Sequence, residues 1–170
     1  IMQSEPYEGS SIAEDQAFLL ALDAAATKDS IEKNVYCDID GVNEKVGMKI
    51  LSNLERDQLL RQNRYFLSEH FARLYPGQDF FAPPTKDKES PKQRFLKEIA
   101  EPTTSLIALQ CKRGLPNSKT VRLIWGKGVS SASGIATREN QTLAFETRAT
   151  FTARMNCERV NENSDCIPLL

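Results

Sequence analysis

The 170-residue chain has the length of one ordinary globular domain. It carries 22 Lys and Arg residues against 23 Asp and Glu, for a formal net charge of −1, and this balance argues against an obligate nucleic-acid binder, which would have a basic excess. Apolar residues make up 40% of the chain, which is enough to build a core, and no apolar run approaches the length of a membrane span. Wholesale disorder and collagen-like repeats are excluded by the same composition.

Three segments in the first third of the chain have the patterns of β-strands. Residues 17–22 form an apolar run bounded by polar residues. Residues 34–39 and 45–50 alternate apolar and polar side chains, and the Asp40-Gly41 pair that follows the first of them is a tight-turn signal. We therefore expect strands at all three places.

The pattern becomes helical between about residues 52 and 102. Ser52 and Glu55 have the spacing of a capping box, and Pro76-Gly77 ends the run that they begin. Ser90-Pro91 is a good start for a second helix. We expect helices over 53–75 and 91–100, the first in one piece or two because its spacing slips after Leu60. The apolar residues of the first run are Leu54, Leu59, Leu60, Phe66, Leu67, Phe71 and Leu74.

The β pattern returns in the last third of the chain, with expected strands at 105–111, 120–125, 142–146 and 150–155. About seven short strands separated by turns predict a mostly β fold with an α insertion, namely an antiparallel seven-stranded β-sandwich. We expect one domain over residues 1–170, with the sandwich formed by 1–51 and 103–170 and the helical insertion at about 52–102. Both ends of the chain look cut, so we expect a segment of a longer protein.

The chain has four cysteines, which allow three disulfide pairings. The polar, Asn-containing linker between Cys157 and Cys166 is typical of a turn that would bring these two together, which leaves Cys37 to pair with Cys111. Oxidised pairs would indicate an extracytoplasmic protein. Free buried thiols in a cytosolic protein are the alternative, and a zinc site would lack the close ligand pairs of known structural sites.

No residue pattern indicates catalysis, so we expect no enzyme activity, no catalytic residue, no cofactor and no metal. The only histidine, His70, lies at helical spacing between apolar residues, which favours a surface or semi-buried position on a helix over Cys–His catalysis. The chain lacks the common nucleophile, zinc, phosphate and dinucleotide motifs. The remaining candidates are weak: acidic residues for a cation (Glu14, Asp15, Asp38, Asp40, Glu158 and Glu162) and a glycosylation sequon (Asn140–Thr142).

Basic residues concentrate between residues 85 and 128, where ten Lys and Arg face four Asp and Glu. Five of them lie in 86–97, in and before the second predicted helix: Lys86, Lys88, Lys92, Arg94 and Lys97. A solvated helix face explains this stretch, and an anion-binding or docking patch is the alternative. Nucleic acid is disfavoured because Phe95 is the only interleaved aromatic residue.

Two phrases resemble those of macroglobulin-like modules. One is the opening Ser4–Ile12, a short Pro/Gly phrase before a strand. The other is Leu115–Gly134, LPNSKTVRLIWGKGVSSASG, in which a loop and a strand are followed by glycines and a small-residue loop. Together with the helical insertion and the four cysteines, they make the chain similar over its whole length to a segment of the bacterial alpha-2-macroglobulins, in particular the enterobacterial periplasmic form.

The resemblance implies a macroglobulin-like or Ig-like sandwich that serves as a scaffold domain in a large protease inhibitor. Proteins of this family trap endopeptidases that cleave an exposed bait region, and many then capture the protease through an internal thioester. Cys37, Cys111 and Cys157 all lack the following residues of the thioester motif, and no bait region is recognisable. The implied location is the periplasm, with an inner-membrane lipid anchor outside this segment.

The implied partners are neighbouring domains of the same chain and, through other parts of the parent protein, trapped proteases, with no nucleic acid and a monomeric state. Two alternatives remain. An Ig-like adhesin or carbohydrate-binding module would need an exposed aromatic platform, but strand alternation places Trp125, the only tryptophan, with Val121 and Leu123 in the core. A thiol or metal enzyme would need a reactive cysteine or bound zinc.

Overall fold

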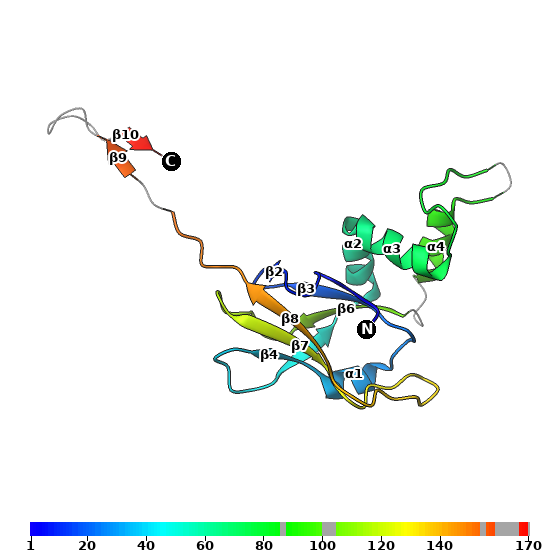
Figure 1. Ribbon diagram of the computed structural model, residues 1–170, viewed down its shortest axis with the longest axis horizontal. Coiled ribbons are helices and arrows are strands. Elements are labelled where there is room, and N and C mark those ends of the chain that lie inside the picture. Colours follow the sequence, from blue (N-terminus) through cyan, green and yellow to red (C-terminus); the bar gives the residue numbers. More distant parts are fainter. Residues whose placement is uncertain (86–87, 100–104, 154–155, 159–166, 170) are drawn as a thin grey trace.

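The structure is a computed structural model that describes residues 1–85, 88–99, 105–153, 156–158 and 167–169. A strongly curled β-sheet forms its body, and a group of helices covers part of it (Figure 1). The helices are α1 (Lys28–Asn34), α2 (Asn53–Gln62), α3 (Arg64–Leu74) and α4 (Pro91–Ile99). The strands are β1 (Gln3–Glu5), β2 (Ser11–Ile12), β3 (Ala17–Ala21), β4 (Val35–Ile39), β5 (Val46–Ile50), β6 (Leu106–Cys111), β7 (Thr120–Trp125), β8 (Gln141–Thr147), β9 (Asn156–Glu158) and β10 (Ile167–Leu169).

Eight strands form one mixed sheet in the order β1-β3-β6-β5-β4-β7-β8-β2. Every neighbouring pair is antiparallel except β2 and β8, which run parallel with Ser11 opposite Glu146. The two edge strands, β1 and β2, are joined directly by residues 6–10, so the two edges of the sheet lie near each other and the sheet wraps around its core. Strands β9 and β10 pair separately, away from this body (Figure 1).

The predicted seven-stranded antiparallel sandwich is therefore wrong, although the mostly β character is confirmed. Two of the strands that were not predicted, β1 and β2, carry no alternating pattern, because β1 is polar (Gln3-Ser4-Glu5) and β2 has only two residues. They form because they complete the edges of a sheet built from other segments. The strand expected at 150–155 is not found over 150–153, where Phe151 is 90% exposed, and residues 154–155 lie outside the described part.

Two cores lie on opposite faces of the sheet. The larger core fills the inside of the curl and contains the buried alternating residues of β4 (Val35, Cys37, Ile39) and β7 (Val121, Leu123, Trp125). The smaller core lies between the sheet and the helices. Strand β3 contributes to both, since Phe18 and Leu20 face the first core and Leu19 and Ala21 the second. A strand buried on both faces is a continuous apolar run, which is the pattern that predicted it.

The helical insertion leaves the sheet after β5 and returns to its neighbour β6, so its ends lie close together as expected. Ser52 and Glu55 form the predicted capping box. The first helical run is two helices, α2 and α3, because Asn63 between them has a non-helical backbone (φ −102°, ψ 64°). Leu54 and Leu74 of the predicted stripe are exposed, whereas the other apolar residues of that run face the second core.

Candidate functional site

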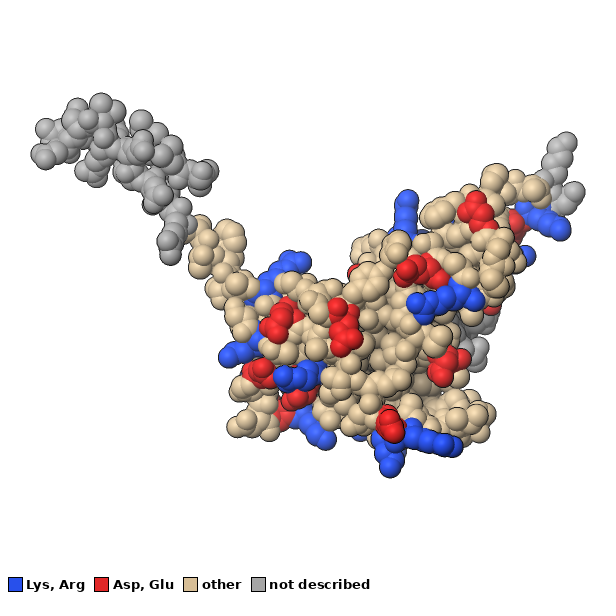
Figure 2. Space-filling view, in the orientation of Figure 1, with Lys and Arg blue, Asp and Glu red and all other residues tan. Residues whose placement is uncertain are grey.

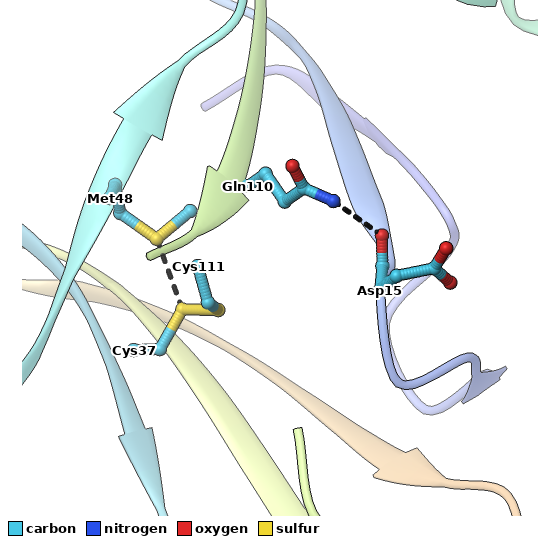
Figure 3. Close-up of a disulfide and its surroundings, with 5 residues drawn as sticks. All are labelled: Asp15, Cys37, Met48, Gln110 and Cys111. Atoms are coloured by element: carbon cyan, nitrogen blue, oxygen red, sulfur yellow. Dashed lines mark hydrogen bonds between the residues drawn. A yellow bond between two sulfur atoms is a disulfide. The ribbon is translucent and has the colours of Figure 1, made fainter. Parts of the chain in front are cut away.

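A disulfide between Cys37 of β4 and Cys111 of β6 ties together strands that are not neighbours in the sheet (Figure 3). The Cα atoms are 6.1 Å apart and 74 positions apart in the sequence. Cys37 is fully buried, and Met48 of the intervening strand β5 places its Sδ 3.0 Å from the Cys37 Sγ. The predicted Cys37–Cys111 pairing is thus present. The side chain of Cys157 and the whole of Cys166 lie outside the described part, so their expected pairing stays a prediction.

The Cys111 end of the disulfide borders a small polar pocket of about 230 Å³. Glu14 and Asp15, a predicted weak cation pair, line this pocket with Gln110 and Arg113. The Gln110 Nε2 donates to the Asp15 carbonyl oxygen at 2.7 Å (Figure 3), and the Leu115 amide donates to the Glu14 carbonyl oxygen at 2.8 Å. These bonds hold the β2–β3 connection against the end of β6, so the disulfide lies in a braced junction.

The glycine-rich part of the 115–134 phrase makes a close backbone contact. The Gly126 amide, directly after β7, donates to the Asn34 carbonyl oxygen at the end of α1 at 3.0 Å. A Cβ on Gly126 would stand 2.2 Å from that oxygen, so no other residue fits. Gly128 has φ +95° and lies over the Asn34 side chain. The phrase is therefore a fitted junction between β7 and α1, a helix that sequence patterns did not predict because Ile31 is its only buried apolar residue.

His70 of α3 is buried, with 4% exposure, and its ring centre is 5.9 Å from that of Phe95 in α4. Burial and the neighbouring Arg73 lower the pKa of the imidazole, while Glu98 opposes this shift. Both cysteines that the structure describes with side chains are in the disulfide, so neither offers a free thiol to His70. The side chain is therefore more deeply buried than the surface or semi-buried position expected from the sequence.

The predicted acidic pair, Asp38 of β4 and Asp40 directly after this strand, faces an arginine of β7. The Arg122 Nη1 of β7 lies 2.8 Å from Asp40 Oδ1 and 3.4 Å from Asp38 Oδ2. Hydrogen bonding to Arg122 lowers the pKa of Asp40. Glu162 lies outside the described part, as does the side chain of Glu158. Within the described residues, no group of three or more His, Cys, Asp or Glu residues is placed to hold a metal.

The tryptophan, the basic stretch and the sequon singled out in the sequence have separate surroundings. Trp125 is 3% exposed in the larger core and offers no aromatic platform. In the basic stretch, Lys97 pairs with Glu89 and Arg94 bonds to Gln78, while Lys86 lies outside the described part. The sequon residue Asn140 uses its Oδ1 to accept from the Lys127 amide at 2.8 Å.

Sequence reasoning missed one group of polar and aromatic residues where β1 meets α3: Gln3, Tyr7, Tyr65 and Glu69. The Gln3 Nε2 donates to Glu69 Oε2 at 2.8 Å, and the Tyr7 hydroxyl lies 3.4 Å from the same oxygen. The two tyrosine rings meet edge to face, with centres 6.5 Å apart. The only sequence signal was that Tyr7 belongs to the Ser4–Ile12 phrase, because the pairing with α3 depends on the curl of the sheet.

No protein-family model and no curated protein matches this chain. Solved structures of the surface-layer protein SbsC show a distant likeness. Domains 1–6 of that protein align with 88% of this chain at 12% identity and a TM-score of 0.39, and its N-terminal part with 87% at 14% identity and the same TM-score. This chain spans 14% and 24% of those two structures, respectively. Among the described residues, no helix is both long and apolar enough to cross a lipid bilayer.

Proposed function

We propose that these residues form a β-rich scaffold domain in a bacterial alpha-2-macroglobulin-like inhibitor, one that traps endopeptidases. The starting point is the sequence resemblance of the Ser4–Ile12 and Leu115–Gly134 phrases. The structural observation that carries the proposal is the Cys37–Cys111 disulfide, which braces β4 against β6 across the larger core. Such a crosslink stabilises a domain by restricting its unfolded chain, and disulfides persist outside the cytoplasm.

Further support comes from the places of the two resembling phrases in the fold. Leu115–Gly134 supplies a core strand and the Gly126 junction, and Ser4–Ile12 supplies both edges of the curled sheet together with the connection between them. Both phrases therefore contribute to the fold of the domain. In this role the domain carries no reactive group of its own and positions the parts of the parent chain that meet the protease.

The test uses the full-length protein that carries these residues, purified from its native host. We expect that mixing it with chymotrypsin lowers the hydrolysis of casein but spares that of a small chromogenic peptide, because an enclosed protease still admits small substrates. The 170-residue chain alone, even in molar excess, should leave the hydrolysis of casein by chymotrypsin unchanged. Equal hydrolysis of casein with and without the full-length protein, or inhibition by the 170-residue chain alone, would contradict the proposal.

A further inference from the structure

Two tyrosines from distant parts of the sequence form an exposed aromatic pair beside an edge of the sheet. Tyr7 lies in the connection between β1 and β2 and is 45% exposed, and Tyr65 lies in the first turn of α3 and is 64% exposed. Their ring planes make an angle of 65°. Rings of this size are usually buried when they have no partner, so an exposed and mutually ordered pair is a candidate contact surface.

Carboxylates surround the pair. Glu69 lies one turn along α3 from Tyr65, and Glu5 and Glu8 flank Tyr7 in the chain. Among the described residues, none of the three has a Lys or Arg within ion-pair distance. Arg73, a turn beyond Glu69, instead donates to the Met2 carbonyl oxygen at 2.7 Å. Figure 2 shows Asp and Glu interspersed with Lys and Arg on the face that carries β2, β3 and α3.

The negative potential of this surface affects its own tyrosines. Partial burial and then the Glu69 charge raise the pKa of Tyr7. Hydrogen bonding to Glu69 raises the pKa of Tyr65. Partial burial also raises the pKa of Glu5. The contribution of Glu69 to both tyrosine shifts is the response expected beside a carboxylate, whereas the Glu5 shift reflects burial alone.

At the base of this surface lies the buried side-chain amide of Gln3, whose donor is bonded but whose acceptor is not. Gln3 is 7% exposed, and its Nε2 donates to Glu69 and, at 3.4 Å, to the Phe66 carbonyl oxygen. Its Oε1 is buried and has no hydrogen-bond partner among the described residues. Buried acceptors are nearly always paired in native proteins, so Gln3 is an exception among the described residues.

We propose that Tyr7, Tyr65 and Glu69 form a docking surface for an Arg or Lys side chain of a partner protein segment. A cation over the electron-rich face of an aromatic ring is attracted to it, and a guanidinium can stack on a ring while it donates to a carboxylate. The unpaired Glu5 and Glu8 extend the negative field along the partner segment. An acidic or purely apolar segment would leave these carboxylates uncompensated. This inference goes beyond the scaffold role, because it assigns a contact surface and the chemistry of its partner.

The test follows the ¹⁵N-labelled 170-residue chain by NMR while N-acetylated, C-amidated tetra-arginine is added at low ionic strength. We expect amide shifts to concentrate at residues 5–10 and in the first two turns of α3. Tyr65→Leu and Glu69→Gln should each weaken binding by roughly 3- to 10-fold. Glu69→Gln keeps an acceptor for Gln3 and removes only the charge.

Phe81→Leu is the matched control, because Phe81 is also an aromatic residue that is 64% exposed but lies in the loop between α3 and α4. It should bind tetra-arginine as the unmodified chain does. Dispersed amide spectra show that each variant is folded.

Three results would overturn the proposal: no shifts at millimolar peptide, shifts centred on Asp38 and Asp40 instead, or equal weakening by Phe81→Leu. Equal binding of tetra-glutamate or of a neutral cello-oligosaccharide at Tyr7 and Tyr65 would also overturn it, since a surface for cations would reject both.

Discussion

Gly126 shows how a single residue type fixes the junction between β7 and α1. Its amide bonds to the Asn34 carbonyl oxygen, and the space that a side chain would need is occupied by that same oxygen. The glycine was visible in the sequence as part of a turn-rich stretch, but its reason was not, because α1 was not predicted. The close approach is a property of two segments that only the folded chain brings together.

Gly126→Ala should destabilise the chain by about 1–3 kcal/mol, because the added methyl overpacks the Asn34 backbone. The measurement is urea unfolding followed by far-UV circular dichroism. Gly114→Ala is the control, since a Cβ there meets no heavy atom within 4 Å, and it should change the unfolding free energy by less than about 0.5 kcal/mol. Equal stability of the two variants would show that the junction is loose.

His70 makes stability depend on pH in a defined direction. Burial lowers the pKa of the folded imidazole below its ordinary 6.5, so the unfolded chain takes up the proton more readily. The free energy of unfolding should therefore fall as pH drops through 6.5 toward the folded pKa, and level off below it. Chemical unfolding at a series of pH values measures this, and the difference between the unmodified chain and His70→Leu isolates the only imidazole. If the difference in unfolding free energy between these two proteins does not change between pH 7.5 and 5, His70 is not shielded from water.

At the scale of elements, the helical insertion is a unit with its own core. Phe71 of α3 packs against Phe80 and against Phe95 of α4, with ring centres 5.3 Å apart in both cases. Strands β3 and β6 complete this core from the sheet side. The insertion therefore depends on aromatic contacts among α3, α4 and the loop between them.

Phe71→Ala should cost about 3–5 kcal/mol, because it empties the centre of that core. Leu74→Ala is the matched change on the same helix, at a site that is 50% exposed, and it should cost less than about 1 kcal/mol. Thermal unfolding followed by circular dichroism compares the two. Similar losses of stability in the two variants would mean that Phe71 does not face the core in solution.

Sequence patterns predicted elements well where one or both faces are buried. Strands β3 to β8 and helices α2 to α4 were expected close to their observed bounds, because each carries an apolar pattern of its own. Strands β1 and β2 and helix α1 were missed, since they are held mainly by partners: β1 by β3, β2 by β8, and α1 by the Gly126 junction. The Tyr7–Tyr65 surface was missed for the same reason.

For the whole molecule, the decisive difference between prediction and structure is how the strands close on each other. Alternation indicates which residues are buried but not whether two faces belong to separate sheets or to one curled sheet. The connection of β1 to β2 through residues 6–10 makes the curl, and the Cys37–Cys111 disulfide then crosses its inside. In the chain-entropy model, a loop of this size contributes about 4–5 kcal/mol, so the disulfide is a major part of the stability of the domain.

The proposed extracytoplasmic scaffold role depends on this disulfide. The most direct measurement is peptide mapping of the protein taken from its native cells with thiols blocked by an alkylating agent at lysis. We expect a peptide pair linked through Cys37 and Cys111, with neither residue alkylated until the sample is reduced. Quantitative alkylation of both before reduction would contradict it, because the brace would then be absent where the protein works.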